Sequence, residues 1–199
     1  DQPGSGRHAR YWPMFRSHSD IPTTESVARL KFANQTLGIT PRRYPVDNAL
    51  ARLAASVFAE HAPRGSLVNV GVGLPEEVCR LVVDAGLMDH VKFFTESGVI
   101  GGLPAPGVFF GAGLCPERIV SSVDVFRMVY EHLDASVLGM LQADSEGNVN
   151  VSKRGEGAIN YVGPGGFMDF SMCADLVIFV SSWMVRSEEH TSELQSRQS

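Results

Sequence analysis

The stretch Ser66-Leu-Val-Asn-Val-Gly-Val-Gly-Leu-Pro-Glu-Glu77 decides the expected fold, because its hydrophobic pattern changes within a few residues. Residues 66–71 form a short apolar run, which is typical of a strand in a buried sheet. Gly71 to Pro75 predict a tight turn, and proline suits the first position of a helix whose first turn carries two acids. An apolar stripe follows and ends at Ala85-Gly86, so the stretch predicts a strand, a turn and a helix.

The neighbouring segments extend this unit into an α/β fold. Upstream, Asp47 is a candidate N-cap for an amphipathic helix that fades near Ala62-Pro63. Downstream, Lys92 to Thr95 form another strand. The order helix, strand, turn, helix, strand implies a βαβ unit. We therefore expect an α/β fold with an open, mostly parallel sheet and flanking helices.

Further elements are less uniform in pattern. Residues 136–141, 149–152 and 176–180 are expected strands, and residues 144–148 form a turn. Residues 26–32 fit either a short strand or a short helix, and the segment between residues 111 and 134 receives no assignment.

Three segments are expected along the chain. Residues 1–45 are polar without a sustained period and are interpreted as a linker or as the tail of a missing upstream half. Residues 46–185 form the α/β domain. Residues 186–199 are excluded, because residues 186–196 resemble the translation of a sequencing adapter. We expect an internal fragment of a longer protein, truncated at its C-terminus.

Composition restricts the function classes. The chain of 199 residues is 44% hydrophobic and 20% charged, which is typical of a globular protein. A formal net charge of −5 without a Lys/Arg cluster argues against nucleic acid as a partner. No apolar run approaches the roughly 20 residues that span a bilayer, so no membrane partner is expected. The three cysteines are far apart and form no Cys-x-x-Cys pair, which favours a reducing, cytoplasmic location.

The glycine turn permits three interpretations. Gly71-Val-Gly-Leu-Pro-Glu76 is similar to the dinucleotide fingerprint, but Glu76 replaces its third glycine and would face a pyrophosphate. The turn can instead serve without a ligand. It can also offer backbone N–H groups to another anionic or carbonyl group.

Familiar hydrolase and metal patterns are missing from the sequence. The six histidines form no metal-spaced pair, and none lies beside a nucleophile. Ser97 and Cys115 have no visible base to activate them, as a catalytic triad requires. We therefore expect neither a triad nor a metal site.

A lone carboxylate remains in the stretch Thr95-Glu-Ser-Gly-Val-Ile-Gly-Gly102. Glu96 is either part of a surface turn or a nucleophile, and a carboxylate is ionised at neutral pH without a general base. A thioester suits so weak a nucleophile, because thiolate is a good leaving group. The oxyanion that forms needs backbone donors, which these glycines could supply: Gly71, Gly73, Gly98, Gly101 and Gly102. In a parallel sheet both loops lie at the carboxyl edge.

Four segments together resemble the class I CoA-transferases. They are residues 70–76, residues 95–105, Gly147-Asn-Val-Asn-Val-Ser152 and Gly163-Pro-Gly-Gly-Phe-Met-Asp-Phe-Ser171. The resemblance covers about residues 46–184 and is strongest to the single-chain acetate/propionate (short-chain acyl) enzymes. It corresponds to the catalytic half of such enzymes, whose other half would lie upstream or in a partner subunit.

The resemblance implies a function and a site. Glu96 would carry CoA as a glutamyl-CoA thioester between an acyl-CoA and a carboxylic acid, with no cofactor beyond CoA as substrate. Gly165 and Gly166 match segments that line the site. Asn150 would orient the acyl or carboxylate group, although Asn148 or a plain turn role stays open. Homo-oligomers and a place in short-chain fatty acid or ketoacid metabolism would follow, and this fragment alone would have little activity.

One departure and two alternatives remain. Tyr130-Glu-His132 stands where relatives often carry a glycine-rich turn, which bears on substrate preference. The same scaffold could host a thioester hydrolase or an isomerase, because fold alone does not fix function. A non-catalytic acyl-CoA-binding module is the other alternative.

Overall fold

The computed structural model describes residues 13–38, 43–105, 107–153, 155 and 161–182. The expected artefact at residues 186–199 lies outside these ranges. Within them, no helix has the length and apolar character needed to cross a membrane.

A six-stranded sheet with the order β10-β7-β1-β2-β3-β6 forms the centre of the structure. Its parallel part consists of β10 (Ala174–Phe179), β7 (Leu133–Leu138), β1 (Ser66–Val70) and β2 (Val91–Phe94). The short strands β3 (Val99–Ile100) and β6 (Arg118–Ile119) add an antiparallel edge. The predicted open, mostly parallel α/β sheet is therefore confirmed.

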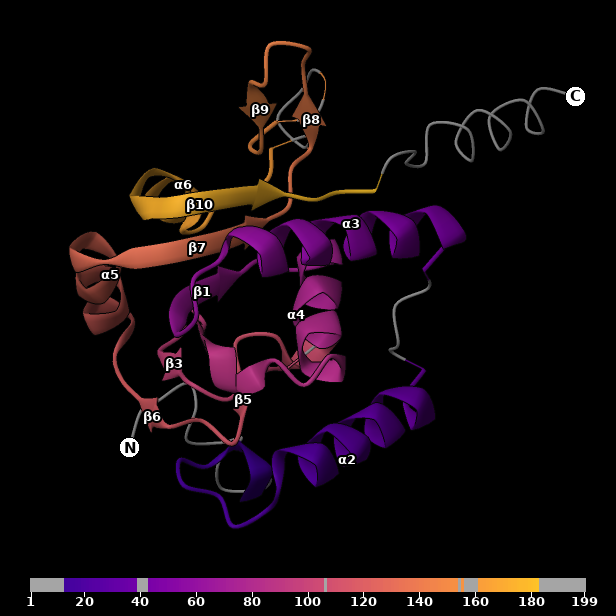
Figure 1. Cartoon of the computed structure of the whole chain (residues 1–199), viewed down its shortest axis with the longest axis vertical. Coiled ribbons are helices and arrows are strands. Elements are labelled where there is room, and N and C mark those ends of the chain that lie inside the picture. The colour runs from indigo at the N-terminus through magenta and orange to yellow at the C-terminus, as the bar shows by residue number, and fades with distance from the viewer. Residues whose placement is uncertain (1–12, 39–42, 106, 154, 156–160, 183–199) are drawn as a thin grey trace, which may run out of the picture.

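Helices cover both faces of the sheet. One face packs against α3 (Pro45–His61) and α4 (Leu74–Asp84), with α2 (Thr23–Thr36) farther out (Figure 1). The other face packs against α5 (Ser122–Glu131) and α6 (Phe167–Cys173). Along β1, Val68 and Val70 belong to the first core and Leu67 contacts the second, as strand alternation requires.

Smaller elements lie outside the main sheet. β4 (Leu103–Pro104) pairs with β5 (Gly113–Leu114), and β8 (Gln142–Ala143) pairs with β9 (Val149–Asn150) in a hairpin that projects from the body (Figure 1). Three 3-10 turns complete the described chain: η1 (Pro13–Phe15), η2 (Met88–His90) and η3 (Gly107–Phe109).

Several expected boundaries need correction. Asp47 is not the N-cap of α3: the helix begins at Pro45, and the N–H of Tyr44 donates to Asp47 Oδ2 at 3.1 Å. Pro75 occupies the second helical position of α4, after Leu74. The strands expected at residues 136–141 and 176–180 begin earlier, at Leu133 and Ala174. The helices α5 and α6 occupy segments without a helix prediction.

The N-terminal segment is more ordered than the linker interpretation implies. Residues 26–32 belong to helix α2, which settles the open choice between strand and helix. Met14, Phe15 and Leu30 are almost fully buried and join the core beside α3 and α4. Residues 13–36 therefore pack onto the domain, and their proposed origin in an upstream half remains a prediction.

Candidate active site

Glu96 lies at the tip of a hairpin between β2 and β3. The Thr95 N–H donates to Val99 O at 2.9 Å, and the Gly98 N–H donates to Thr95 O at 3.1 Å, so the chain reverses at once. Thr95 is 1% exposed, and its hydroxyl lies 2.8 Å from Ser97 Oγ; both hydroxyls donate to Gly111 O. These hydrogen bonds to Gly111 fix the hairpin, while the side chain of Glu96 remains exposed.

The carboxylate of Glu96 meets a glycine pair from a distant part of the chain. The Gly166 N–H donates to Glu96 Oε2 at 3.1 Å. A Cβ at Gly166 would lie 2.9 Å from the same oxygen, and one at Gly165 would lie 3.6 Å from either carboxylate oxygen. The absence of side chains at both positions therefore lets the backbone approach Glu96, and the structure brings these predicted site residues together.

Two adjoining pockets open at this place. The first, of about 270 Å³, is lined by Glu96, Gly165, Gly166 and Gly71, together with Asn69 and Phe170. The second, of about 390 Å³, includes Gly73. Both share a wall formed by Val72, Gly139, Gly163, Pro164 and Phe167. The expected convergence of loops at the carboxyl edge of the sheet is thus observed for the glycine turn, Glu96 and the Gly165-Gly166 loop.

The glycine turn lines the pockets, but two of its N–H groups are already committed. The Gly71 N–H donates to Val137 O at 2.8 Å, and the Gly73 N–H donates to Glu76 Oε1 at 2.9 Å. The other oxygen of Glu76 accepts from the Gly107 N–H at 3.1 Å. In this structure, Gly71 and Gly73 therefore shape the site without offering the oxyanion donors that the sequence suggested.

The position of Glu76 explains why it stands in place of a third glycine. Its carboxylate caps the start of α4, next to the turn, and takes the Gly73 N–H that a pyrophosphate would need. Burial raises the pKa of Glu76, partly countered by the two backbone hydrogen bonds and by Arg43. Glu76 is thus a structural carboxylate in a desolvated setting.

Gly98, Gly101 and Gly102 serve close packing. A Cβ at Gly98 would lie 2.0 Å from Val120 O, and one at Gly102 would lie 2.1 Å from Leu114 O. The Gly101 N–H donates to Phe93 O at 2.8 Å, and the Gly98 N–H is used within the hairpin. None of the three lines either pocket, so an oxyanion role is not supported by their placement.

Asn150 lies on the β8–β9 hairpin and does not line either pocket. Its Nδ2 donates to Gln142 Oε1 and to Lys153 O, both at 2.6 Å. Its Oδ1 accepts from the N–H groups of Ser152 and Lys153, at 3.1 and 3.3 Å. The side chain therefore fixes a turn, and of the alternatives left open the turn role fits this geometry. Asn148 likewise bonds to Asp144, at 2.8 Å.

Asn69 is a candidate that the sequence did not reveal. It is 3% exposed on β1, yet it lines the pocket of Glu96. Ser136 Oγ, on the neighbouring strand, donates to Asn69 Oδ1 across a long 3.4 Å contact, which orients the amide. The sequence did contain a signal for it. Asn69 is a polar residue inside a strand whose neighbouring residues, Val68 and Val70, are buried in the core.

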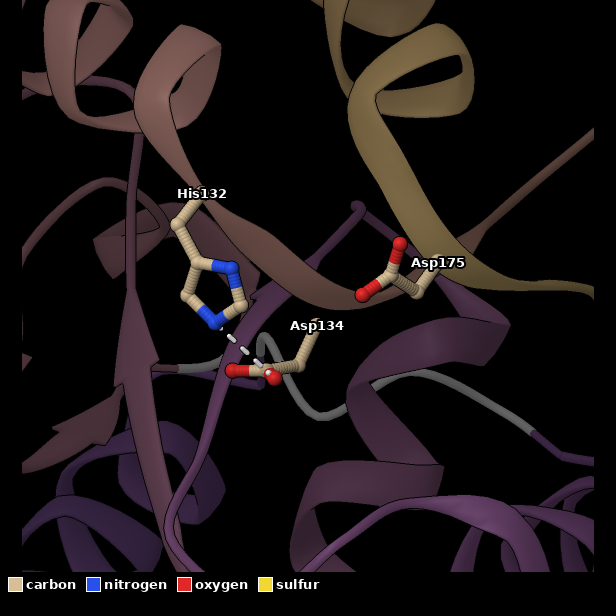
Figure 2. A group of neighbouring side chains, drawn as sticks. All are labelled: His132, Asp134 and Asp175. Atoms are coloured by element: carbon tan, nitrogen blue, oxygen red, sulfur yellow. Dashed lines mark ion pairs between the residues drawn. The ribbon is translucent and has the colours of Figure 1, made fainter.

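One further group has the chemistry of a cation site. His132, Asp134 and Asp175 place one ligand atom each within 4.8 Å of one another, at the amino ends of β7 and β10 (Figure 2). However, His132 Nε2 already pairs with Asp134 Oδ1 at 3.0 Å, and Asp134 Oδ2 accepts from the Leu67 N–H at 2.7 Å. These contacts explain the group as a structural ion pair that secures the start of β7.

Comparison with known proteins places the chain among relatives of the CoA-transferases. It is 35% identical to the caffeate CoA-transferase of Acetobacterium woodii over 148 residues, covering 72% of this chain and 27% of the relative. It is 32% identical to the acetate CoA-transferase YdiF of Escherichia coli K12 over 117 residues, covering 58% of this chain and 22% of the relative. The chain thus spans about a quarter of the length of these curated relatives. No family model matches it.

A solved structure supports the same relationship. The acyl-CoA transferase YdiF of Escherichia coli O157:H7, in a thioester complex with CoA, superposes with a TM-score of 0.57 at 26% identity. The match covers 74% of this chain and 29% of that one.

Proposed function

We propose that this chain carries the catalytic centre of an enzyme that moves CoA from an acyl-CoA to a carboxylic acid, with Glu96 as the nucleophile. The single observation that carries the proposal is the exposed carboxylate of Glu96 in a pocket, held by the Gly166 N–H at 3.1 Å. The relationship to CoA-transferases supports the substrate class.

In the first half-reaction, a carboxylate oxygen of Glu96 attacks the thioester carbonyl of the acyl-CoA. The C–S bond breaks and CoA leaves as a thiolate, giving an acyl–glutamyl anhydride. The thiolate then attacks the glutamyl carbonyl and expels the donor acid as its carboxylate. Glu96 is left as a glutamyl-CoA thioester, and no proton is transferred in either step.

The second half-reaction reverses these two steps, with the acceptor acid in place of the donor acid. The acceptor carboxylate attacks the glutamyl thioester and releases CoA thiolate, which then attacks the acyl carbonyl of the new anhydride. This step forms the new acyl-CoA and returns Glu96 as a free carboxylate. Charge is conserved at every stage, since each anionic nucleophile replaces an anionic leaving group. Among possible donor acids we propose short-chain ones.

The oxyanion in each step needs a donor inside the pocket. The Nδ2 of Asn69 is suited to this role, because its amide is buried, oriented by Ser136 and located in the same pocket as Glu96. The Gly166 N–H is the second donor, and becomes free when the charge of Glu96 is consumed by acylation. The adjoining pocket of about 390 Å³ would hold the rest of the thioester.

We further propose that residues 46–185 are the catalytic half of the longer class I enzyme, and that its other half completes the CoA site from upstream or from a partner subunit. The reaction needs no cofactor beyond CoA as substrate. Under this proposal, purified residues 1–185 turn over little or no substrate. Measurable transfer by that fragment would contradict this part of the proposal.

The decisive experiment follows a covalent adduct in the full-length protein. Incubation with an acyl-CoA in the absence of acceptor should attach CoA at Glu96, detected by mass spectrometry of the peptide. Glu96→Gln should abolish the adduct and lower transfer by at least about 10⁴-fold, as the loss of a nucleophile does. Glu60→Gln, at an exposed position on α3 that lines neither pocket, is the matched control and should retain full activity.

The alternatives give different outcomes in the same experiment. A thioester hydrolase would release free acid and CoA without acceptor, and would accumulate no adduct. A non-catalytic acyl-CoA-binding module would bind the acyl-CoA equally well with and without Glu96→Gln. An adduct located at another residue would overturn the assignment of Glu96.

A further inference from the structure

The pocket of Glu96 divides into two parts. The wall that it shares with the adjoining pocket of about 390 Å³ faces the space proposed for the rest of the thioester. The apolar side chains that line the Glu96 pocket alone form what we call the acyl wall: Val70, Phe110, Leu138 and Phe170. The acyl chain and the sulfur leave a thioester carbonyl carbon in different directions. An acyl-CoA with its CoA arm in the adjoining pocket therefore places its acyl chain against the acyl wall.

Phe110 differs from the rest of the acyl wall in its packing. Val70 is 2% exposed, Leu138 is 4% exposed and Phe170 is 3% exposed. Val70 and Phe170 also belong to the two cores on opposite faces of the sheet. Phe110, in contrast, is half-buried and belongs to neither core. Its ring therefore lines the pocket without serving either core.

The backbone beside Phe110 is tied to the hairpin that carries Glu96. Gly111 O accepts from the hydroxyl of Thr95 at 3.2 Å and from the hydroxyl of Ser97, the two residues that flank Glu96 in the chain. A Cβ at Gly111 would lie 3.4 Å from Ser97 Oγ, so the two segments are in close contact. These contacts hold the segment of Phe110 beside the nucleophile, and the protein itself thus sets where the ring stands relative to the reacting carboxylate.

The size of the pocket fits a short acyl chain. Its volume of about 270 Å³ lies below the roughly 300–1,000 Å³ that is typical of pockets for drug-sized ligands. The three buried side chains of the acyl wall cannot move aside easily, because protein interiors are close-packed. Phe110 is thus the member of the acyl wall whose size can change the space for the acyl chain without disturbing a core.

We propose that Phe110 determines the length of the acyl chain that the transfer centre accepts. A short acyl group fits between Glu96 and the phenyl ring, whereas a longer one meets the ring before its carbonyl carbon reaches the carboxylate. Removing the ring lengthens this space and leaves Asn69 and Gly166 in place. The inference rests on the proposed function, because it concerns the acyl group that Glu96 would receive.

The test compares donors of two lengths in the full-length protein: propionyl-CoA and hexanoyl-CoA, each with acetate as the acceptor. The quantity measured is the ratio of kcat/KM for hexanoyl-CoA to kcat/KM for propionyl-CoA. Phe110→Ala should raise this ratio by at least about tenfold, because one methylene group in an apolar pocket changes kcat/KM by about 10–200-fold. Phe110→Leu, which removes less of the side chain, should give a ratio between those of the wild type and Phe110→Ala.

Phe32→Ala is the matched control, because Phe32 is 71% exposed on α2 and lines neither pocket. It should leave the ratio unchanged. The urea midpoint of unfolding of Phe110→Ala should stay close to that of the wild type, since the ring belongs to neither core. A strongly lowered midpoint would show Phe110 to be a structural residue and would contradict the proposal.

The outcomes separate this inference from the proposed function. A wild type that neither transfers CoA from propionyl-CoA nor forms the adduct at Glu96 would overturn both. Transfer by the wild type, together with an unchanged or lowered ratio in Phe110→Ala, would overturn the role of Phe110 alone. A ratio that rises stepwise from the wild type through Phe110→Leu to Phe110→Ala would support it.

Discussion

Glu76 and Glu96 carry the same functional group in opposite settings. Glu76 accepts two backbone N–H groups, from Gly73 and Gly107, in a desolvated position at the start of α4. Glu96 is exposed at the tip of a hairpin and accepts from Gly166. The contacts of Glu76 therefore explain it as part of the architecture, whereas the carboxylate of Glu96 is exposed, as the proposed nucleophile requires.

Glu76 should give the protein a pH-dependent stability of defined sign. Its native pKa lies above the ordinary value of 4.5, so the native state binds this proton more tightly than the unfolded state. The stabilising contribution is complete below 4.5 and is lost as pH rises through the raised native value. Urea unfolding from acid to neutral pH should show the free energy of unfolding of the wild type falling relative to that of Glu76→Gln.

Glu131→Gln is the control for that comparison, because Glu131 is exposed and its replacement should show no such trend. A flat or rising difference between wild type and Glu76→Gln would mean that the two backbone donors outweigh burial, and the prediction would be wrong.

Alanine substitutions at Gly98 and Gly86 can distinguish the stability cost of backbone strain from the cost of a steric clash. Both have positive φ, at 109° and 73°, so alanine is strained at either position. A Cβ at Gly98 would lie 2.0 Å from Val120 O, whereas nothing lies within 4 Å at Gly86. Gly86→Ala should cost about 1–2 kcal/mol and Gly98→Ala at least about 3 kcal/mol, measured by urea unfolding. If both substitutions lowered the free energy of unfolding equally, the backbone near β3 would have shifted to relieve the clash with Val120 O, and the prediction would be wrong.

At the scale of elements, the sequence correctly predicted the helices and strands that have a clear apolar periodicity. β1, α4 and β2 lie within a residue or two of their expected bounds, because apolar period and turn chemistry agree there. The helix α6 has only seven residues beside a glycine-rich loop, too few for a helical period to show. The helix α5 offered a signal that was missed: Ser121 and Asp124 precede Val125 and Val129 at helical spacing.

The N-cap of α5 provides an element-scale prediction. Ser121 Oγ accepts from the Asp124 N–H at 3.1 Å, and Ser121→Ala removes this bond at the start of the helix. The free energy of unfolding should fall by about 1 kcal/mol. Ser121→Asn should retain most of the stability, and Ser122→Ala, on the exposed first residue of the helix, should change it by less than about 0.5 kcal/mol. A larger loss in Ser122→Ala than in Ser121→Ala would contradict the capping role.

At the scale of the whole molecule, topology explains which site residues could be anticipated. Parallel strands bring their carboxyl ends to one edge, so the meeting of Glu96 with the glycine turn followed from the predicted sheet. The Gly165-Gly166 loop was expected only from family resemblance, because no spacing rule brings it to Glu96. The Gly71 N–H bonds to Val137 O on the neighbouring strand β7, and the Gly98 N–H bonds within its own hairpin. The sequence pattern shows neither bond, and this is why both glycines were wrongly expected to be free donors.

The burial of Phe15 tests whether the N-terminal segment belongs to the same folding unit as the sheet. Phe15 is 3% exposed and contacts Phe109 with ring centroids 6.1 Å apart, whereas Phe32 on α2 is 71% exposed. Phe15→Ala should therefore lower the free energy of unfolding by about 3–5 kcal/mol, and Phe32→Ala by less than about 0.5 kcal/mol. Urea unfolding followed by fluorescence and by circular dichroism should give one coincident transition for Phe15→Ala, shifted as a whole. If only part of the signal shifts, or if both variants are equally stable, residues 13–36 fold separately from the sheet. That outcome would support the interpretation of this segment as a linker.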